Sequence, residues 1–471
     1  MDTALWHIWI GPVIAAIHIL GLIAAAHATL TARTSQGAIA WAVSLVFMPY
    51  LALVPYLIFG RSKFAGYVEA RRMHNRQFHA HTHAFRTSDT ACAEVEAQLG
   101  HRLAGIRTLT TLTDLPFSRG NDVHLLINGG PTFDAILDAI GAARHYVIVQ
   151  FFVVVDDGLG RRLQSALIAK AAEGVPVYFL YDGIGSHALP ESYVAKLRRS
   201  GAQAQEFLTR RRRLINRYQL NFRNHRKIVV VDGERAFVGG HNVSDEYLGL
   251  KPPLSPWRDT HIEVAGLAVA DIQLAFVEDW YWVTGHVPAL RWQPASQPSN
   301  MHCQVVPSGP ADAQETCALF FVQAINAART RLWITTPYLI PDEAVFTALK
   351  LAVLRGVDVR ILIPSRPDHL IVFNASSQYA HEAVRAGIKV YRYQPGFLHQ
   401  KVLLIDEDAA AVGSTNLDNR SFRLNFELTV LTVDPGFAMQ VAAMLDADFA
   451  QARRVEPAEY TDASMPRRVL M

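Results

Sequence analysis

Two long uncharged stretches open the chain. The first ends at Arg33 and the second at Arg61, and neither contains an Asp, Glu, Lys or Arg beyond the terminal Asp2. Each exceeds the roughly 20 apolar residues that cross a bilayer. Residues 24–28 would pass for a signal-peptide cleavage site, but the start of the chain is not basic and a second apolar stretch follows. We therefore predict a hairpin of two transmembrane helices in residues 1–60 and a juxtamembrane segment over residues 61–110.

Beyond residue 110 the hydrophobic pattern occurs twice. In each half an apolar run is followed by a helical pattern that ends near a glycine, Gly174 or Gly356, and then by a second apolar run. Strand, helix, glycine cap and strand form a βαβ unit, which predicts an α/β fold with a mixed sheet flanked by helices. The expected division is into two similar lobes and a Pro-, Ser- and Gln-rich junction: residues 111–290, 291–471 and 285–300.

Basic residues predict the orientation of the N-terminal hairpin. The connector carries only Arg33, whereas several basic residues follow the second stretch: Arg61, Lys63, Arg71, Arg72 and Arg76. The positive-inside rule then places the N-terminus and the lobes in the cytoplasm, with the connector outside. Half of the residues are hydrophobic, which is high for a wholly soluble enzyme, whereas the net charge of only +3 says little about partners. Cys92, Cys303 and Cys317 lack metal or disulfide spacing, which predicts free thiols in a reducing compartment.

Each lobe contains one copy of a polar motif, His-x-Lys followed by an Asp and then by Gly-x-x-Asn. Its members are His225, Lys227, Asp232, Gly239 and Asn242 in the first copy and His399, Lys401, Asp406, Gly413 and Asn416 in the second. Alternate residues of a strand share a face, so each His and Lys are expected to point the same way. A turn from Asp232 to Arg235 would set Asn242 opposite His225. An imidazole, a cation and an amide together suit a phosphate anion.

The paired motifs resemble the phospholipase D superfamily and, within it, the bacterial cardiolipin synthases. Residues 239–247, residues 420–427 and the uncharged N-terminal stretches also carry the resemblance. It implies two lobes of the phospholipase D type and a set of catalytic residues: His225, Lys227, Asp232, His399, Lys401 and Asp406. It further implies phosphate-binding and histidine-orienting residues: Asn242, Asn416 and Ser414 for phosphate, and Asp259 and Glu427 for the imidazoles. Gly240 replaces the serine of the second copy, so we expect the two halves to bind phosphate unequally.

The chemistry implied by this resemblance needs both histidines at one phosphorus atom. By analogy, His225 is the nucleophile and His399 is the acid and then the base, although the sequence alone leaves the reverse assignment open. No acidic cluster has metal-ligand spacing, so we predict neither a metal nor a cofactor. The implied reaction joins two phosphatidylglycerol molecules into cardiolipin and glycerol through a phosphohistidine intermediate at the bacterial inner membrane.

Three alternatives remain at this stage. One is a phospholipase D or a phosphatidyltransferase that uses another head-group alcohol, and another is a non-catalytic, lipid-binding membrane scaffold. A nuclease is less favoured because it has little use for a membrane hairpin. The basic run Arg210–Arg213, with Arg217, Arg223 and Arg226, would suit anionic lipid or nucleic acid, and the membrane stretches favour lipid, so no nucleic-acid partner is expected. His74, His79, His81 and His83 are interpreted as solvated residues rather than metal ligands. Whether the protein forms homo-oligomers is left open.

Overall fold

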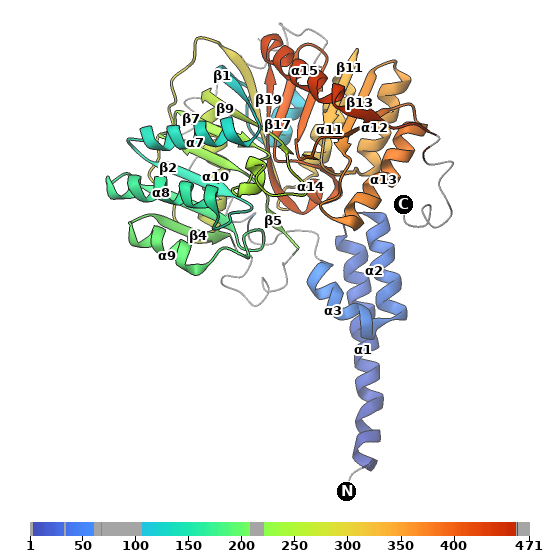
Figure 1. Ribbon diagram of the computed structural model, residues 1–471. Coiled ribbons are helices and arrows are strands. Elements are labelled where there is room, and N and C mark those ends of the chain that lie inside the picture. Colours follow the sequence, from blue (N-terminus) through green and yellow to red (C-terminus); the bar gives the residue numbers. More distant parts are fainter. Residues whose placement is uncertain are drawn as a thin grey trace.

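The two lobes share one continuous mixed β-sheet (Figure 1). The structure is a computed structural model that describes residues 3–32, 34–60, 67, 106–207, 221–457 and 459. The predicted junction, residues 285–300, contains neither helix nor strand and connects α10 (Ala268–Thr284) to β10 (Met301–Ser308). The predicted α/β fold with a duplicated, helix-flanked mixed sheet is thus confirmed.

The strands of the two lobes follow the same order outward from the centre of the sheet. In the first lobe they are β1 (Ser118–Ile127), β9 (Thr260–Gly266), β7 (Arg235–Gly239), β6 (Ile228–Val231), β2 (Val147–Phe151), β3 (Val177–Asp182) and β4 (Gln203–Phe207). In the second lobe they are β10, β19 (Asn425–Val433), β17 (Ala409–Gly413), β16 (Val402–Ile405), β11 (Arg331–Thr335), β13 (Asp358–Pro364), β14 (Lys389–Tyr393) and β20 (Ala452–Arg454). Antiparallel pairing of β1 with β10 joins the lobes.

Each lobe contains the βαβ unit that its sequence predicts. Helix α8 (Gly158–Ala172) connects the parallel strands β2 and β3, and α12 (Glu343–Leu354) connects β11 and β13. Gly174 and Gly356 follow these helices with φ of +83° and +86°. A residue with a Cβ is strained in this left-handed conformation, so glycine lets the chain turn directly into the next strand.

Helices cover both faces of the sheet. On one face α10 and α15 (Pro435–Ala450) pack in a core that both lobes share. On the other face the first lobe has α7 (Gly129–Ala142), α8 and α9 (Glu191–Arg199), and the second has α6 (Ile106–Thr113), α11 (Thr316–Ala327), α12 and α13 (Leu370–Arg385). The motif strand β6 is buried on both faces, with Val230 in the shared core and Val229 beneath α7 and α8. Apolar residues on both sides of the strand hold the motif hairpin rigidly.

Helix α6 precedes the first strand of the first lobe and packs against the second lobe. Leu109 of α6 packs in the core of the second lobe with Val306 and Phe320, so the chain contacts the second lobe before β1 enters the first. Domain limits of 111–290 and 291–471 remain our proposal for the duplicated units. Most of the predicted juxtamembrane segment, residues 61–110, lies outside the described residues. The same holds for Cys92, for Arg210–Arg213 and for the four histidines His74, His79, His81 and His83, whereas Cys303 and Cys317 are free and buried.

The N-terminal segment forms three helices, α1 (Thr3–Thr31), α2 (Ser35–Phe47) and α3 (Pro49–Phe59). Helices α1 and α2 form the predicted hairpin, with Ala28 and Leu45 buried in their contact. Thr34 caps the second arm, since its side chain accepts a hydrogen bond from the Gly37 N–H at 3.0 Å. That arm is broken after Met48, because Pro49 occupies the first turn of a new helix.

This break corrects the prediction of two transmembrane helices. Among the described helices, only the segment Ile10–Thr31 is long and apolar enough to cross a bilayer. At 1.5 Å per residue α2 and α3 extend about 20 Å and about 16 Å, short of the roughly 30 Å hydrocarbon layer. The connector also differs from expectation, because Ala32 and Thr34 line a pocket against the second lobe. Figure 1 accordingly shows the N-terminus at the far end of α1 from the lobes.

Candidate active site

The two lobes exchange short strands next to each motif histidine. β5 (Arg223–Asn224) of the first lobe pairs in parallel with β19 of the second, and β15 (Phe397–Leu398) of the second pairs with β8 (Trp257–Arg258) of the first. The pairing continues one step further, because the His225 N–H donates to Phe426 O at 2.9 Å and the His399 N–H donates to Arg258 O at 2.8 Å. Each histidine is therefore positioned by the backbone of the opposite lobe.

Strand exchange brings each predicted orienting acid to a histidine of the other lobe. His225 Nδ1 lies 2.9 Å from Glu427 Oε2, and His399 Nδ1 lies 2.6 Å from Asp259 Oδ2. Both carboxylates are fully buried. A carboxylate only accepts, so it places the ring proton on Nδ1 and leaves Nε2 of each imidazole for chemistry. Lys401 Nζ also lies 3.0 Å from His399 Nδ1, but this nitrogen carries the hydrogen that it donates to Asp259, so it does not accept a hydrogen bond from Lys401.

Both histidines line one cavity of about 730 Å³ between the lobes, as do Asn242 and Asn416. The asparagines do not lie opposite the histidines as predicted. Pairing of Ile228 with Val238 shows that the turn is one residue shorter than expected, so continued pairing would set residue 241, not Asn242, across from His225. Asn242 reaches the cavity because β7 has already ended.

The side chain of Asn242 is fixed by its neighbours. Its Oδ1 accepts from the Val153 N–H at 3.1 Å, and its Nδ2 donates to Tyr247 Oη at 2.6 Å. His241, which precedes it, is fully buried and packs against His261 and Phe133, which agrees with the prediction that it points away from the Asn242 face. One amide hydrogen of Asn242 is still available to a ligand in the cavity.

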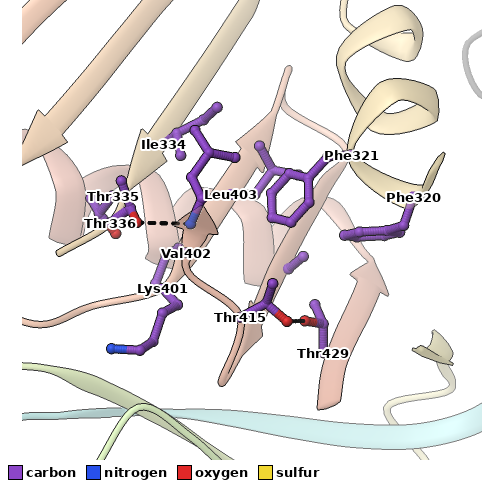
Figure 2. Close-up of a pocket in the computed structure, with 12 residues that line it drawn as sticks. Phe320, Phe321, Ile334, Thr335, Thr336, Lys401, Val402, Leu403, Thr415 and Thr429 are labelled. Atoms are coloured by element: carbon purple, nitrogen blue, oxygen red, sulfur yellow. Dashed lines mark hydrogen bonds between the residues drawn. The ribbon is translucent and has the colours of Figure 1, made fainter. Parts of the chain in front are cut away.

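The motif lysines lie behind the histidines. Lys227 Nζ donates to His225 O at 2.7 Å, and Lys401 Nζ donates to His399 O. Figure 2 shows Lys401 extending away from a small cavity between β16 and α11, with its nitrogen pointing toward the first lobe. That small cavity, of about 10 Å³, has no room for a ligand, so the cavity between the lobes is the candidate site.

Burial changes the proton affinity of every motif cation. It lowers the pKa of His225 to about 4 and, together with Lys401 and Lys227, lowers the pKa of His399 well below its usual value. Phe152 lies 5.0 Å from the His225 ring and Trp257 lies 5.2 Å from the His399 ring, which accounts for much of this loss of solvent. The pKa of Lys227 falls to about 7 and that of Lys401 to about 8, again chiefly by burial.

The residue after each motif glycine contacts the carboxylate that holds a histidine and does not line the cavity. The fully buried Ser414 donates its hydroxyl hydrogen bond to Glu427 Oε2, which corrects its predicted role in binding phosphate. In the other copy, a Cβ on Gly240 would lie 2.1 Å from Asp259 Oδ1. Glycine at this position leaves room for the close approach of Asp259, so the difference between the copies concerns how each carboxylate is held.

Asp232 and Asp406 were predicted to be catalytic, and the structure places them elsewhere. Each follows its motif strand at the end far from the histidine, about 23 Å along an extended chain. Asp232 accepts hydrogen bonds from the N–H groups of residues 144–146 at 2.7–3.2 Å, and Asp406 accepts from those of residues 329–331 at 2.8–3.1 Å. They anchor the motif hairpin to the neighbouring strand and do not touch the cavity.

Two buried acids that the sequence did not indicate hold the residue between each His and Lys. Arg226 donates to Asp279 Oδ2 of α10 at 3.0 Å, and Gln400 donates to Asp448 Oδ2 of α15 at 2.7 Å. Arg226 is only 3% exposed, which corrects its assignment to a lipid-attracting basic run. The sequence offers one signal for these acids: Asp279 and Asp448 lie on equivalent helices, the last long helix of each lobe.

Asp448 also joins the two lobes. Arg258 of the first lobe donates to both of its carboxylate oxygens, at 2.7 and 2.8 Å, and both side chains are buried. We expect Arg258→Met to destabilise the protein by about 3–5 kcal/mol, because it leaves a buried carboxylate without its cation. The measurement is thermal unfolding in detergent. Arg162→Met, at an exposed ion pair with Asp134, is the control and should change Tm far less; equal shifts would contradict a bridging role for Arg258.

Crossed histidine–carboxylate pairs at the interface of two duplicated α/β lobes define a phosphodiester-handling site of the phospholipase D type. A family model described as cardiolipin synthase, PLD-like domain, matches residues 136–251 and 321–451. A second, described as phospholipase D-nuclease N-terminal, matches residues 10–61. Within the described residues no group of three or more His, Cys, Asp or Glu side chains is arranged to hold a metal ion.

Curated relatives give the family. The chain is 59% identical to cardiolipin synthase A of Pseudomonas aeruginosa (strain LESB58) over 449 residues, which cover 95% of this chain and 91% of the relative. It is 57% identical to cardiolipin synthase A of Pseudomonas entomophila (strain L48) over 452 residues, with 96% and 94% covered. The chain belongs to the bacterial cardiolipin synthases, enzymes of the phospholipase D superfamily. A phosphatidylserine synthase of Haemophilus influenzae Rd KW20 has the same fold, with a TM-score of 0.59, 15% identity and coverage of 78% and 96%.

Proposed function

We propose that the protein transfers the phosphatidyl group of one phosphatidylglycerol to the terminal hydroxyl of a second, giving cardiolipin and glycerol. The observation that carries this proposal is that His225 and His399 line one cavity, each with Nδ1 bound to a carboxylate and Nε2 left to react. Family membership and an apolar N-terminal helix support a lipid substrate. One phosphodiester replaces another, so the reaction needs no nucleotide.

In the first half-reaction His225 Nε2 attacks phosphorus while His399 protonates the departing glycerol oxygen. In the second half-reaction His399 accepts the proton of the incoming hydroxyl, and that oxygen displaces His225. Lys227 and Lys401, with Asn242 and Asn416, stabilise the charge on the non-bridging oxygens. An anionic phosphodiester also offsets the repulsion that lowers the pKa of His399, and so favours the protonated acid when substrate is bound.

Apolar side chains around the cavity favour transfer over hydrolysis. Phe152, Leu254, Trp257 and Val372 line it and limit the access of water to the phosphohistidine. The test is to incubate the purified protein with labelled phosphatidylglycerol in vesicles and to separate the products. Cardiolipin with released glycerol supports the proposal. Phosphatidic acid alone would mean a phospholipase D, and no turnover would mean a scaffold. When a second head-group alcohol is added to the vesicles, a phosphatidyl ester of that alcohol in place of cardiolipin would mean another acceptor.

The depressed pKa values of the two lysines predict a pH dependence. A lysine is charged below its pKa, so the free enzyme loses the cation at Lys227 above about pH 7 and that at Lys401 above about pH 8. We expect kcat/KM for a short-chain phosphatidylglycerol to fall about tenfold per pH unit for each neutral lysine. Arginine does not deprotonate, so Lys401→Arg should flatten the upper part of the profile even if its maximum is lower. A wild-type profile that stays level to pH 10 would contradict this reading.

For the membrane segment we propose that α1 is the single span, with its N-terminus outside and the lobes in the cytoplasm. Helices α2 and α3 would then enter and leave the same membrane face. The connector between α1 and α2 lines a pocket against the second lobe, which supports this arrangement. The positive-inside rule supports it as well. Arg33, Arg61 and Lys63 are close in sequence to Ala32, Thr34 and Gly60, which line the pocket against the second lobe, whereas residues 1–9 carry no Lys or Arg.

This topology predicts different exposure of the two termini. In cells with a permeabilised outer membrane, added protease should digest an epitope tag fused before Met1 and leave a C-terminal tag intact. A hairpin of two spans would protect both tags, and immunoblotting distinguishes the two results. Lysed cells, in which both tags should be digested, provide the control for tag accessibility.

A further inference from the structure

A second large pocket lies where the N-terminal helices meet the second lobe. Its volume is about 1420 Å³, and it opens between the connector of α1 and α2, the end of α3 and the helices α12 and α14 (Asn419–Arg423). Figure 1 shows α1 and α2 reaching the underside of the second lobe at this place. The volume exceeds the range of about 300–1000 Å³ that ordinary small-molecule ligands occupy, so the pocket has room for a large amphiphile.

The junction pocket adjoins the active-site cavity. Asn419 and Arg420 at the start of α14 line both, so this helix end separates them. Arg420 is exposed, and its guanidinium is held from one side by hydrogen bonds to Asn221, at 3.0 Å to the backbone oxygen and 3.4 Å to Oδ1. Because Arg420 lines both cavities, its guanidinium lies at their boundary, where an anion would be bound by a positioned cation.

The two walls of the junction pocket differ in polarity. The N-terminal helices contribute only uncharged side chains, with Trp41 and Phe59 beside the polar Thr34, Ser35 and Gln36. The lobe contributes three acids and three bases: Asp342, Glu343, Glu382, Lys350, Arg420 and Arg423. Arg423 pairs with Asp342 at 3.0 Å. The outward faces of α2 and α3 carry exposed apolar residues that suit lipid chains: Ile39, Val43, Phe47, Leu51, Val54 and Leu57. A charged wall beside an uncharged one, next to these exposed apolar faces, matches the head group and the chains of a phospholipid.

The proposed reaction gives a reason for such a site. Cardiolipin contains two phosphates, and only one of them can lie between His225 and His399 when the bond is formed. The phosphate of the acceptor needs its own cation, at a short distance from the reacting hydroxyl. Arg420 is a cation at the boundary of the active-site cavity and the junction pocket.

We propose that the junction pocket is the binding site of the acceptor phosphatidylglycerol, with Arg420 on the acceptor phosphate and the acyl chains along Trp41 and Phe59 toward the bilayer. This inference rests on the proposed function. It assigns the donor lipid to the cavity between the histidines and the acceptor to a separate site that reaches the membrane.

The test separates the acceptor step from the donor step. Phosphatidylglycerol vesicles are supplied with ethanol, and cardiolipin and phosphatidylethanol are measured together. Ala344→Trp fills the junction pocket from an exposed position on α12 without removing a hydrogen bond, and Leu354→Trp places the same indole at an exposed position of this helix outside the pocket. We expect Ala344→Trp to lower cardiolipin formation about tenfold or more while phosphatidylethanol changes by less than about twofold. Leu354→Trp should change neither product.

Two outcomes would overturn the acceptor site. One is an equal loss of both products in Ala344→Trp, and the other is no loss of either. Thr347→Trp, at another exposed lining position, provides the same measurement if Ala344→Trp does not fold. Arg420→Gln should raise the concentration of phosphatidylglycerol needed for half-maximal cardiolipin formation. A wild-type protein that makes neither product would instead refute the proposed function.

Discussion

Asparagine in place of His225 is expected to abolish cardiolipin formation, with a loss on the order of 10⁵-fold. The imidazole forms the covalent bond to phosphorus, and an asparagine amide of similar size cannot do so. The same change at His399 is expected to cause a comparable loss with phosphatidylglycerol, because the glycerol oxygen then leaves without a proton. Product formation in vesicles is the measurement. His124→Asn, at an exposed position on β1, is the control and should retain full activity.

A substrate with a better leaving group distinguishes the two roles. The phosphatidyl ester of p-nitrophenol releases a stable anion that needs no proton, so His399→Asn should release p-nitrophenol in a single burst and His225→Asn should not. The reverse pattern would show that the nucleophile is His399 and the acid is His225. Full activity in either variant would contradict the proposed double displacement.

The sequence predicted the features that depend on local patterns. Three such patterns span only a few residues each: the repeated spacing around His225 and His399, the apolar motif strands, and the glycines at positions 174 and 356. The structure contains the corresponding hairpins and βαβ units. A one-residue error in the turn after Val231 still put Asn242 on the wrong partner, because side chains alternate along a strand. Register inside a short hairpin therefore depends on turn geometry that composition alone does not define.

The features that the sequence missed depend on contacts between distant segments. Two-residue strands such as β5 and β15 have no hydrophobic periodicity, yet they pair each histidine with the opposite lobe. Asp232 and Asp406 lie within the motif, which made them candidates for catalysis, but their partners are N–H groups of another strand end. Pro49 was visible in the sequence, but the sequence did not show that it starts a new helix. Only the observed ends of α2 and α3 show that each helix is too short to cross a bilayer.

The crossed pairs make a prediction that pairing within a lobe would reverse. Asp259→Asn and Glu427→Gln should each lower turnover of phosphatidylglycerol on the order of 10³–10⁴-fold, because an amide favours the wrong tautomer of its imidazole. Asp259 contacts His399, so its variant should resemble loss of the acid and regain p-nitrophenol release. Glu427 contacts His225, so its variant should remain slow with both substrates.

Pairing within each lobe would exchange these results, with Glu427→Gln rescued by the good leaving group and Asp259→Asn not rescued. A double variant sharpens the test, since residues that act as one unit are not additive. His399→Asn with Asp259→Asn should be no slower than His399→Asn alone, whereas His399→Asn with Glu427→Gln should lose more of the p-nitrophenol burst. Glu263 lies on β9, the strand that begins directly after Asp259, and pairs with Arg235 at 2.6 Å. Glu263→Gln should retain activity, which would show that the effect is specific to the acids that contact the histidines.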